Sequence, residues 1–309
     1  MNNDLNFVIL LNKGDLWFAR ICVASIRFFY PNNDIFLLPD FANGFFSTKE
    51  IELNFNVKVL DYGIKKFGWG IGKLFPIIDE KFKDIRVLML DADIALLGPL
   101  DKDLTGNGIN KNSRDFIVSG EQCDNPYEQW VKDIYFDVNA VKQIDVNYDF
   151  PGYFFNSGCF IFTGGMLSEI DFELVFNKKK YPFVLREDLL PFPDQSILNF
   201  ILPIMEKKGR FRIKYDFPFM IWSKDYSRMQ PIQLNDVINN KIENLIHWAG
   251  DLRSPFLSRM NGSEILIFFE NSYYSKIKFG SLIRFFRKYE FVLYTLKKRI
   301  ASKLNSYLR

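Results

Sequence analysis

The sequence has few of the residues on which many metal and redox proteins depend. Its three cysteines, Cys22, Cys123 and Cys159, lie far apart and form no Cys-x-x-Cys pair. This spacing offers no thiolate metal site and suits a reducing compartment. The chain also has a single histidine, His247. Because a lone histidine is more often a core or surface residue than a ligand, a role for His247 requires independent support.

Long apolar segments are also absent. No stretch reaches the roughly 18 consecutive apolar residues that a membrane-spanning helix requires. The short apolar run at residues 7–11 follows Asp4 without a basic flank, which is unlike a secretory signal peptide. We therefore expect a cytoplasmic protein, and we expect any contact with a membrane to be peripheral.

The composition is that of a globular protein with an excess of aromatic residues. Of 309 residues, 48 % are hydrophobic and 25 % are charged, which argues against disorder and allows one or two domains. Aromatic residues reach 17 %, with 34 Phe and 14 Tyr. A nucleotide bias would produce this excess, and aromatic residues fill cores in any protein. Surfaces that stack on sugars or bases are the functional alternative.

Strands and helices alternate over the first hundred residues. Short apolar runs predict strands at 7–11, 34–38, 57–60 and 86–90, and helical spacing predicts helices at 16–30, from 47, and at 71–79. This alternation is typical of a parallel sheet with right-handed crossovers. The rest of the chain is more mixed, with strands predicted at 116–119, 154–162 and 245–248 and a helix at 194–206. Ligands of parallel sheets bind at the carboxyl ends of strands, so the residues after Leu90 are the first candidates for a site.

Two carboxylates follow the fourth predicted strand. In VLMLDADIALLGPL, Asp91 and Asp93 point to the same side because side chains alternate along a strand, and Ala92 points away. Two carboxylates on one face repel each other unless a cation lies between them. Oxygen ligands with open coordination positions suit Mg²⁺ or Mn²⁺. The pair therefore predicts a metal site, although Asp-x-Asp alone is a weak signal.

A different class of enzyme uses the same pattern. Phosphatases of the haloacid dehalogenase type place Asp-x-Asp after an apolar strand, with the first Asp as nucleophile and the second as acid. Their strand usually comes near the start of the domain, and a Thr or Gly cluster follows the pair. Here three predicted strands come first and Ile94-Ala95-Leu96 follows, so the phosphatase interpretation ranks lower.

Together with three further segments, the Asp-x-Asp pair resembles glycosyltransferase family 8, whose members have the A-type glycosyltransferase fold. The segments are YFFNSGCFIF, FPDQSILNFIL and LIHWAGDLRSPF, which come in the order of the family's motifs. The resemblance covers roughly residues 6–256. It implies an α/β fold with a Rossmann-like mixed sheet flanked by helices. We expect one glycosyltransferase domain at 1–270, with a donor-binding half at about 1–115 and an acceptor half at about 116–270, followed by a C-terminal region at 271–309.

The resemblance also implies how a nucleotide-diphosphate donor is held at its charged centre. Asp91, Asp93 and His247 would ligate Mn²⁺ (or Mg²⁺), which carries the diphosphate. Arg253 and Lys73 would add positive charge on the same oxygens. Gly250 belongs to the histidine motif and would line the donor site.

Other residues of the matching segments would bind the two ends of the donor. Asn156 would lie beside the sugar, Asp194 would accept hydrogen bonds from its hydroxyls, and Gln195 would lie near the anomeric carbon. Asn12 and Asp15 follow the first strand, where family members bind uridine. The structural alternatives are a tight turn at Asn156 and a helix N-cap at Asp194.

The implied activity is metal-dependent transfer of a hexose-type sugar from a UDP-sugar, with retention of the anomeric configuration. The acceptor would be a glycan or glycolipid, such as a surface oligosaccharide or lipopolysaccharide. Ser196 stands where the family usually has an acid, which weakens any inference about the sugar. A catalytically silent nucleotide-sugar-binding scaffold is the alternative, and the intact metal set argues against it.

The C-terminal region is basic and amphipathic. Residues 275–309 hold ten Lys or Arg and one acid, about +9, so the rest of the chain carries about −6 within the net charge of +3. Apolar residues recur there at helical spacing: Leu282, Phe285, Phe286, Tyr289, Leu293, Leu296, Ile300 and Leu304. We expect this helix to lie on an anionic membrane surface, with packing on the body as the alternative. No nucleic acid is expected, because no recognition motif accompanies the charge.

Overall fold

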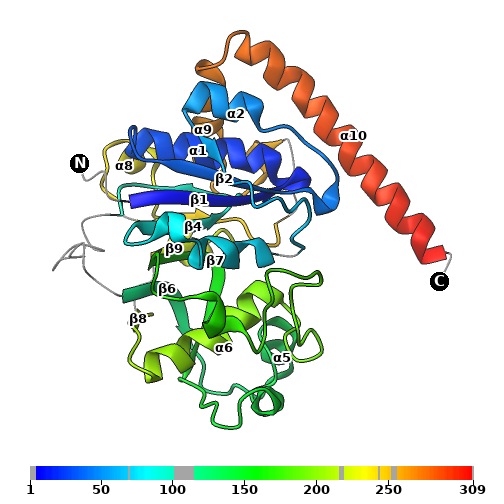
Figure 1. The fold of residues 1–309 in the computed structure, drawn as a ribbon. Coiled ribbons are helices and arrows are strands. Elements are labelled where there is room, and N and C mark those ends of the chain that lie inside the picture. Colours follow the sequence, from blue (N-terminus) through cyan, green and yellow to red (C-terminus); the bar gives the residue numbers. More distant parts are fainter. Residues whose placement is uncertain are drawn as a thin grey trace.

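The computed structural model describes residues 5–68, 70–100, 115–215, 219–242, 244–251 and 256–307. Within these ranges the strands form a seven-stranded mixed sheet, in the order β3-β2-β1-β4-β7-β6-β8, and a three-stranded sheet, in the order β5-β10-β9 (Figure 1). The strands are β1 (Leu5–Asn12), β2 (Ile35–Asp40), β3 (Lys58–Val59), β4 (Arg86–Asp91), β5 (Ile94–Leu96), β6 (Asp115–Gln122), β7 (Tyr153–Thr163), β8 (Arg212–Lys214), β9 (Met220–Trp222) and β10 (Leu245–His247). The helices are α1 (Leu16–Phe29), α2 (Lys49–Phe55), α3 (Leu74–Ile77), α5 (Gln129–Ile134), α6 (Pro193–Lys207), α7 (Tyr226–Met229), α8 (Leu234–Ile238), α9 (Ser263–Ser275) and α10 (Gly280–Tyr307). A mixed sheet flanked by helices is the α/β class that the sequence predicts.

Three parallel strands end at one edge of the large sheet. Both β2 and β4 pair with β1 in parallel, with Asp40 opposite Asn12 and Asp91 opposite Leu10. The carboxyl ends of these strands therefore bring Asn12, Asp40 and Asp91 to one edge, where a parallel sheet binds its ligands. Strand β7 runs antiparallel to both β4 and β6, which makes the sheet mixed and joins the second half of the chain to the first.

Alternating side chains of the large sheet supply two hydrophobic cores, one on each face. In β1, Phe7 and Ile9 belong to the core that also contains residues of α1, α9 and the small sheet. Val8 belongs to the other core, which contains residues of α3 and α6. Because both faces are covered, the parallel strands read in the sequence as continuous apolar runs.

The small sheet holds the single histidine beside the carboxylate pair. Strand β10 pairs antiparallel with β5, with His247 opposite Ile94, and β5 begins directly after Asp93. The next residue, Trp248, donates its backbone N–H to the Asp93 carbonyl at 3.0 Å. Two segments far apart in the chain are thus fixed side by side by backbone hydrogen bonds.

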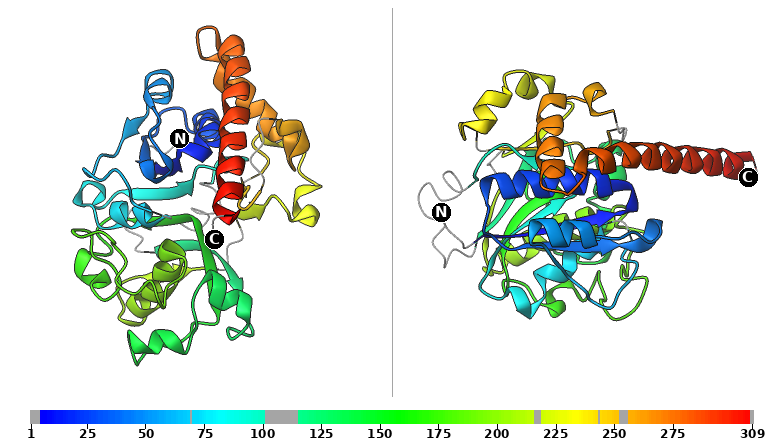
Figure 2. Two further views of the ribbon diagram at one scale, coloured as in Figure 1. Left: turned by 90° about the vertical axis from the view of Figure 1, so that its right-hand side faces the viewer. Right: turned by 90° about the horizontal axis from the view of Figure 1, so that it is seen from above.

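Helix α10 runs along one side of the molecule, and its C-terminal part extends beyond the other elements (Figure 2). Ile283 and Phe291 pack against the first core, and Arg287 pairs with Glu50 of α2. The apolar stripe seen in the sequence faces outward instead, since its members from 282 to 300 are between 48 % and 63 % exposed. The side chain of Leu304 lies outside the described part of the chain. Within the described ranges, no helix has both the length and the apolar character needed to cross a bilayer.

Candidate active site

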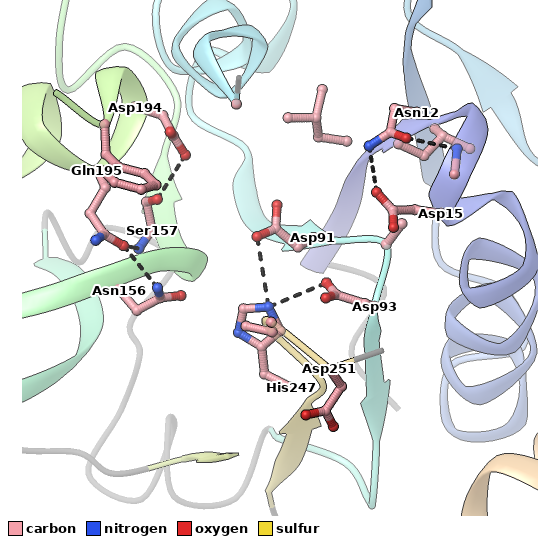
Figure 3. Close-up of a pocket in the computed structure, with 18 of the residues that line it drawn as sticks. Asn12, Asp15, Asp91, Asp93, Asn156, Ser157, Asp194, Gln195, His247 and Asp251 are labelled. Carbon is pink, nitrogen blue, oxygen red and sulfur yellow. Dashed lines mark hydrogen bonds and ion pairs between the residues drawn. The ribbon is translucent and has the colours of Figure 1, made fainter. Parts of the chain in front are cut away.

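Two carboxylates and one imidazole meet at the edge where β4 ends. Asp91, Asp93 and His247 offer ligand atoms that all lie within 4.8 Å of one another. His247 Nε2 lies 3.2 Å from Asp93 Oδ1 and 3.8 Å from Asp91 Oδ2. Asp93 and His247 are buried, whereas the side chain of Asp91 is partly exposed. The structure thus brings together the three residues that the sequence predicts as metal ligands (Figure 3).

The chemistry of this set fits a divalent cation. Carboxylate oxygens suit Mn²⁺ and Mg²⁺, and neutral imidazole is a common third ligand. His247 directs Nε2 toward the carboxylates, and within the described residues its buried Nδ1 has no hydrogen-bond partner. Gly158 leaves room for the His247 imidazole and the Asp91 carboxylate, because a Cβ at position 158 would stand 2.3 Å from His247 Cε1 and 2.9 Å from Asp91 Oδ2. A larger residue at 158 would displace the imidazole or the carboxylate.

Lys73 links Asp91, and with it the candidate metal-ligand set of Asp91, Asp93 and His247, to helix α6. Its Nζ lies 2.7 Å from Asp91 Oδ1 and 2.9 Å from Asp194 Oδ2, and it donates to the Ser157 carbonyl at 3.1 Å. An ammonium group has three donors, so each has a protein oxygen to meet. The sequence predicts that Lys73 contacts the diphosphate, whereas the structure places its ammonium between two acids of the site.

Asp194 is the second residue of α6, which begins at Pro193 with Phe192 as its N-cap. The N-cap interpretation of Asp194 is therefore wrong. Its Oδ2 instead accepts a hydrogen bond from Ser157 Oγ at 2.7 Å, in addition to the Lys73 contact. The backbone of Gly70 approaches this carboxylate, since a Cβ there would lie 2.4 Å from Asp194 Cγ. With a φ of 75° at Gly70, glycine meets both the backbone and the space requirement.

A bulge in β7 aims Asn156 and Ser157 at the cleft. The pairing register between β6 and β7 shifts between Val118 and Gly120, and bulges of this kind redirect side chains next to binding sites. Asn156 Nδ2 donates to Gln195 Oε1 at 2.8 Å, so the two amides hold each other. The alternative of a tight turn at Asn156 is wrong, because the residue lies inside β7.

The loop after β1 lies on the other side of the candidate metal-ligand set (Figure 3). Asn12 Oδ1 accepts the Gly14 N–H at 2.8 Å, and Asn12 Nδ2 donates to Asp15 Oδ2 at 2.5 Å. These bonds close the short helical turn at 13–15 that follows the strand. Asn12 and Asp15, predicted to meet the base of the donor, both line the cleft.

The histidine motif continues into a positive-φ glycine. Gly250 has a φ of 67°, lines the cleft, and accepts a hydrogen bond on its carbonyl from Lys224 Nζ at 3.2 Å. Arg253 lies outside the described residues, so its contact with a diphosphate stays a prediction. Lys224, which no motif indicates, also lines the cleft and lies 3.4 Å from Asp251.

The residues described above line one cleft of about 1360 Å³. Negative charge predominates in it: among the described lining residues there are two lysines, Lys73 and Lys224, and seven acids, namely Asp15, Asp40, Asp91, Asp93, Glu121, Asp194 and Asp251. Burial raises the pKa of Asp91 to about 6, opposed by the charge of Lys73 and reinforced by Asp93. An anionic ligand would be repelled at this edge unless a cation accompanied it.

Several lining residues carry no recognisable sequence signal. Trp222 stacks on the His247 ring with centroids 5.3 Å apart, and it donates through Nε1 to Glu121 at 3.1 Å. It reaches the site only because β9 pairs with β10. Ser157 is the exception, since it stands within the Phe-Asn-Ser-Gly segment and could have been selected with Asn156.

Comparison with solved structures identifies the architecture. The bifunctional glycosyltransferase WbbM matches with a TM-score of 0.56 at 14 % identity, over 87 % of this chain and 50 % of WbbM. The fold is that of an A-type glycosyltransferase. This confirms the fold expected from the resemblance to family 8. The chain spans half the length of WbbM, so the similarity concerns the fold and does not extend to the activities of the whole WbbM protein.

Two other matching structures are also glycosyltransferases. The galactosyltransferase LgtC, solved with donor and acceptor sugar analogues, matches with a TM-score of 0.47 at 16 % identity, over 87 % of this chain and 95 % of LgtC. The glycosyltransferase GlyE of Streptococcus pneumoniae TIGR4 matches with a TM-score of 0.48 at 15 % identity, over 92 % of this chain and 62 % of GlyE. No protein-family model matches the sequence, and no curated protein sequence matches it. Function therefore has to be argued from the site.

Proposed function

We propose that this chain is a metal-dependent, retaining glycosyltransferase that moves a hexose-type sugar from a UDP-sugar to a glycan acceptor. The observation that carries the proposal is the meeting of Asp91, Asp93 and His247 in a large cleft at the carboxyl ends of parallel strands. The A-type fold shared with the glycosyltransferase WbbM supports the reaction class.

The charge of the cleft supports a metal-bridged diphosphate. Asp91, Asp93 and His247 would hold Mn²⁺ or Mg²⁺, which when bound supplies positive charge to the departing diphosphate. Lys73 holds one oxygen of Asp91 and would keep that carboxylate oriented. Lys224 and Arg253 are proposed to contribute further positive charge where the diphosphate leaves.

The sugar would lie against the bulge of β7 and the start of α6. Asn156 and Gln195 present amide groups there, joined by their own hydrogen bond. The contacts of Asp194 with Ser157 and Lys73 both use Oδ2, so Oδ1 is the oxygen that a sugar hydroxyl would meet. We place the anomeric carbon near Gln195, and the proposed acceptor enters from the side of Trp130, which lines the cleft and is 47 % exposed.

The proposed acceptor is a surface oligosaccharide or lipopolysaccharide precursor. We propose that α10 holds the enzyme at the membrane that carries this acceptor. The outward face of α10 carries apolar side chains, and the region from 275 onward is strongly basic. An apolar stripe flanked by basic residues binds anionic lipid surfaces through both burial and charge. Enzyme and lipid-linked acceptor would then meet at the same surface.

Titration calorimetry of UDP tests the donor site directly. With Mn²⁺ present, UDP should bind the wild type, and it should bind much more weakly when Mn²⁺ is omitted or in the variants Asp93→Asn and His247→Ala. A variant at the exposed, distant Asp34, such as Asp34→Asn, should bind UDP like the wild type.

The other two interpretations predict different results. A haloacid-dehalogenase-type phosphatase would hydrolyse a phosphate ester, would require Asp91, and would tolerate His247→Ala. A silent scaffold would bind UDP-sugars and release no UDP from any of them, with or without a glycan acceptor. UDP binding that is independent of the metal and unchanged in His247→Ala would contradict the proposed site.

A further inference from the structure

Helix α10 supplies part of the wall of the donor cleft. Phe291, Tyr294 and Thr295 line it together with Asn12 and Asp15 of the loop after β1. This loop lies across the metal-ligand set from Asn156 and Asp194 (Figure 3). The α10 residues therefore belong to the end of the cleft away from the proposed sugar site.

Specific contacts place the α10 aromatic rings against that loop. The ring centroid of Tyr294 lies 5.7 Å from Lys13 Nζ, and a Cβ on Gly14 would stand 3.9 Å from Tyr294 Oη. Phe291 meets Trp17 of α1 edge-to-face, with centroids 6.2 Å apart. The pKa of Tyr294 is raised by burial and by the neighbouring Asp15 carboxylate, which agrees with this position.

An ion-pair network fixes α10 in this place. Arg287 forms a two-pronged pair with the Glu50 carboxylate, which also accepts the Tyr273 hydroxyl at 2.8 Å and lies 3.5 Å from Arg20 Nε. Arg284 pairs with Glu270 one turn earlier. Paired, partly buried guanidinium groups of this kind set the geometry of a helix more firmly than exposed lysines do. The pocket-lining face of α10 is therefore built into the fold.

We infer that Tyr294 and Phe291 bind the nucleobase of the donor, so that α10 is the base-recognition wall of this enzyme. The inference rests on the proposed function and deepens it. The loop after β1 offers polar groups that are already bonded to one another, Asn12 to Asp15 and Gly14, whereas α10 brings the flat aromatic surface. A base has an apolar π-face that stacks on aromatic side chains, and the phenolic hydroxyl of Tyr294 can donate to or accept from its edge.

Glu50 has a different part in this arrangement. It lies on α2 and holds Arg287, and it is not among the residues that line the cleft. We assign it as a positioning residue, whose loss lets α10 move and thereby weakens base binding. Its effect should therefore appear in the binding of a nucleotide and be absent from the binding of the phosphates alone.

Paired calorimetric titrations with UDP and with inorganic pyrophosphate, both in Mn²⁺, separate the base site from the metal site. Tyr294→Ala should weaken UDP binding about tenfold, the size expected for one lost base–aromatic stack, and leave pyrophosphate binding unchanged. Tyr294→Phe keeps the ring and should retain most of the affinity for UDP. Glu50→Gln should weaken UDP binding a few-fold with no effect on pyrophosphate. The matched control is Tyr289→Ala, the same substitution on the exposed face of the same helix, which should change neither.

The outcomes separate this inference from the proposed function. If Tyr294→Ala and Phe291→Ala bind UDP like the wild type while Asp93→Asn does not, the base-recognition wall is wrong and the metal-bridged site stands. If Tyr294→Ala weakens UDP binding while Asp93→Asn and metal removal have no effect, the base wall stands and the metal-dependent function falls. If UDP, GDP, CDP, ADP and dTDP all fail to bind the wild type, both ideas are overturned.

Discussion

The ammonium of Lys73 joins Asp91 to Asp194, two acids that lie far apart in the sequence and that the fold brings together. Asp91 belongs to the proposed metal set and Asp194 to the proposed sugar site, so one buried cation ties the two together. Lys73→Met would leave both carboxylates without this partner. Because Asp91 keeps some contact with solvent, we expect a loss of about 3 kcal/mol in the free energy of unfolding, the low end for a broken buried pair.

Urea unfolding in EDTA measures this loss, and Lys58→Met provides the control. Lys58 lies 2.7 Å from Asp34, the same distance as Lys73 from Asp91, but the side chains of Lys58 and Asp34 are both about half exposed. Such surface pairs contribute under about 1 kcal/mol. Equal losses in the two variants would show that burial of the Lys73 pair has no energetic consequence. Mn²⁺ should restore more stability to Lys73→Met than to the wild type, because it supplies the missing positive charge.

Gly70→Ala should damage the sugar end of the site through a direct clash. The new Cβ would lie 2.4 Å from Asp194 Cγ, so the carboxylate would have to leave its position beside Lys73 and Ser157. Gly63→Ala is a close match, since Gly63 has a φ of 70° against 75° at Gly70, and nothing lies within 4 Å of its Cβ position. Both variants bear the backbone cost of alanine at positive φ, about 1 kcal/mol or somewhat more.

The two glycine variants are compared by thermal unfolding and by transfer assays with UDP-sugars. We expect a larger loss of melting temperature for Gly70→Ala, because the displaced Asp194 also loses its contact with Lys73. The fall in kcat/KM should be at least tenfold larger than for Gly63→Ala. Equal kcat/KM values for the two variants would show that Asp194 is not part of the sugar site.

Short-range patterns carried the prediction of the fold and of the metal ligands. The apolar run before Asp91 marks a strand covered on both faces, and its carboxyl end is a site by topology, so the position of the Asp pair followed from local sequence. His247 needed the motif as well, because its approach to Asp93 depends on the pairing of β10 with β5. The bulge that turns Asn156 into the cleft has no local signal, which is why a turn was a reasonable alternative.

Long-range contacts account for what the sequence did not predict. The face of α10 that packs on the body combines Ile283, Arg287 and Phe291, a mixture of apolar and charged side chains that does not stand out beside the more apolar outer stripe. Arg287 can lie on the packed face of α10 because it forms an ion pair with Glu50 of α2. Sequence spacing does not show which distant residue a charged side chain will pair with. The position of α10 at the cleft could therefore be recognised only in the structure.

Metal binding should stabilise the folded protein through the same three ligands. A ligand that binds only the native state at 100 times its dissociation constant adds about 2.7 kcal/mol. Mn²⁺ should therefore raise the melting temperature of the wild type by several degrees, and the rise should vanish in Asp93→Asn and His247→Ala. Asp236→Asn, at a partly exposed acid of α8 that does not line the cleft, serves as the control and should keep the full effect. A rise that persists in both ligand variants would place the metal elsewhere.

Acid should release α10 through Glu50. Burial alone would raise the pKa of Glu50, but hydrogen bonds from Arg287 and Tyr273 outweigh it, and the pKa lies below the ordinary 4.5. A lowered native pKa means that the stability from this carboxylate is fully present above pH about 4.5 and is lost as pH falls through the native value. Urea unfolding of wild type and Glu50→Gln should differ by about 1–2 kcal/mol at neutral pH and converge below pH 4. A difference that stays constant down to pH 3 would mean that the charge on Glu50 contributes nothing.

The outer face of α10 should bind anionic vesicles without help from the cleft. Phe286 is 63 % exposed on that face, and Phe45, in the connection after β2, is 77 % exposed and far from it in the chain. In sedimentation with vesicles containing phosphatidylserine, Phe286→Ser should lower the bound fraction several-fold, whereas Phe45→Ser should not. Each basic residue near such a surface contributes about 1 kcal/mol, so raising the salt concentration should release the wild type. UDP binding in Mn²⁺ should be the same for Phe286→Ser and wild type, because Phe286 is not among the residues that line the cleft. Binding to neutral and anionic vesicles alike, or no effect of Phe286→Ser, would mean that α10 does not dock on an anionic membrane through this face.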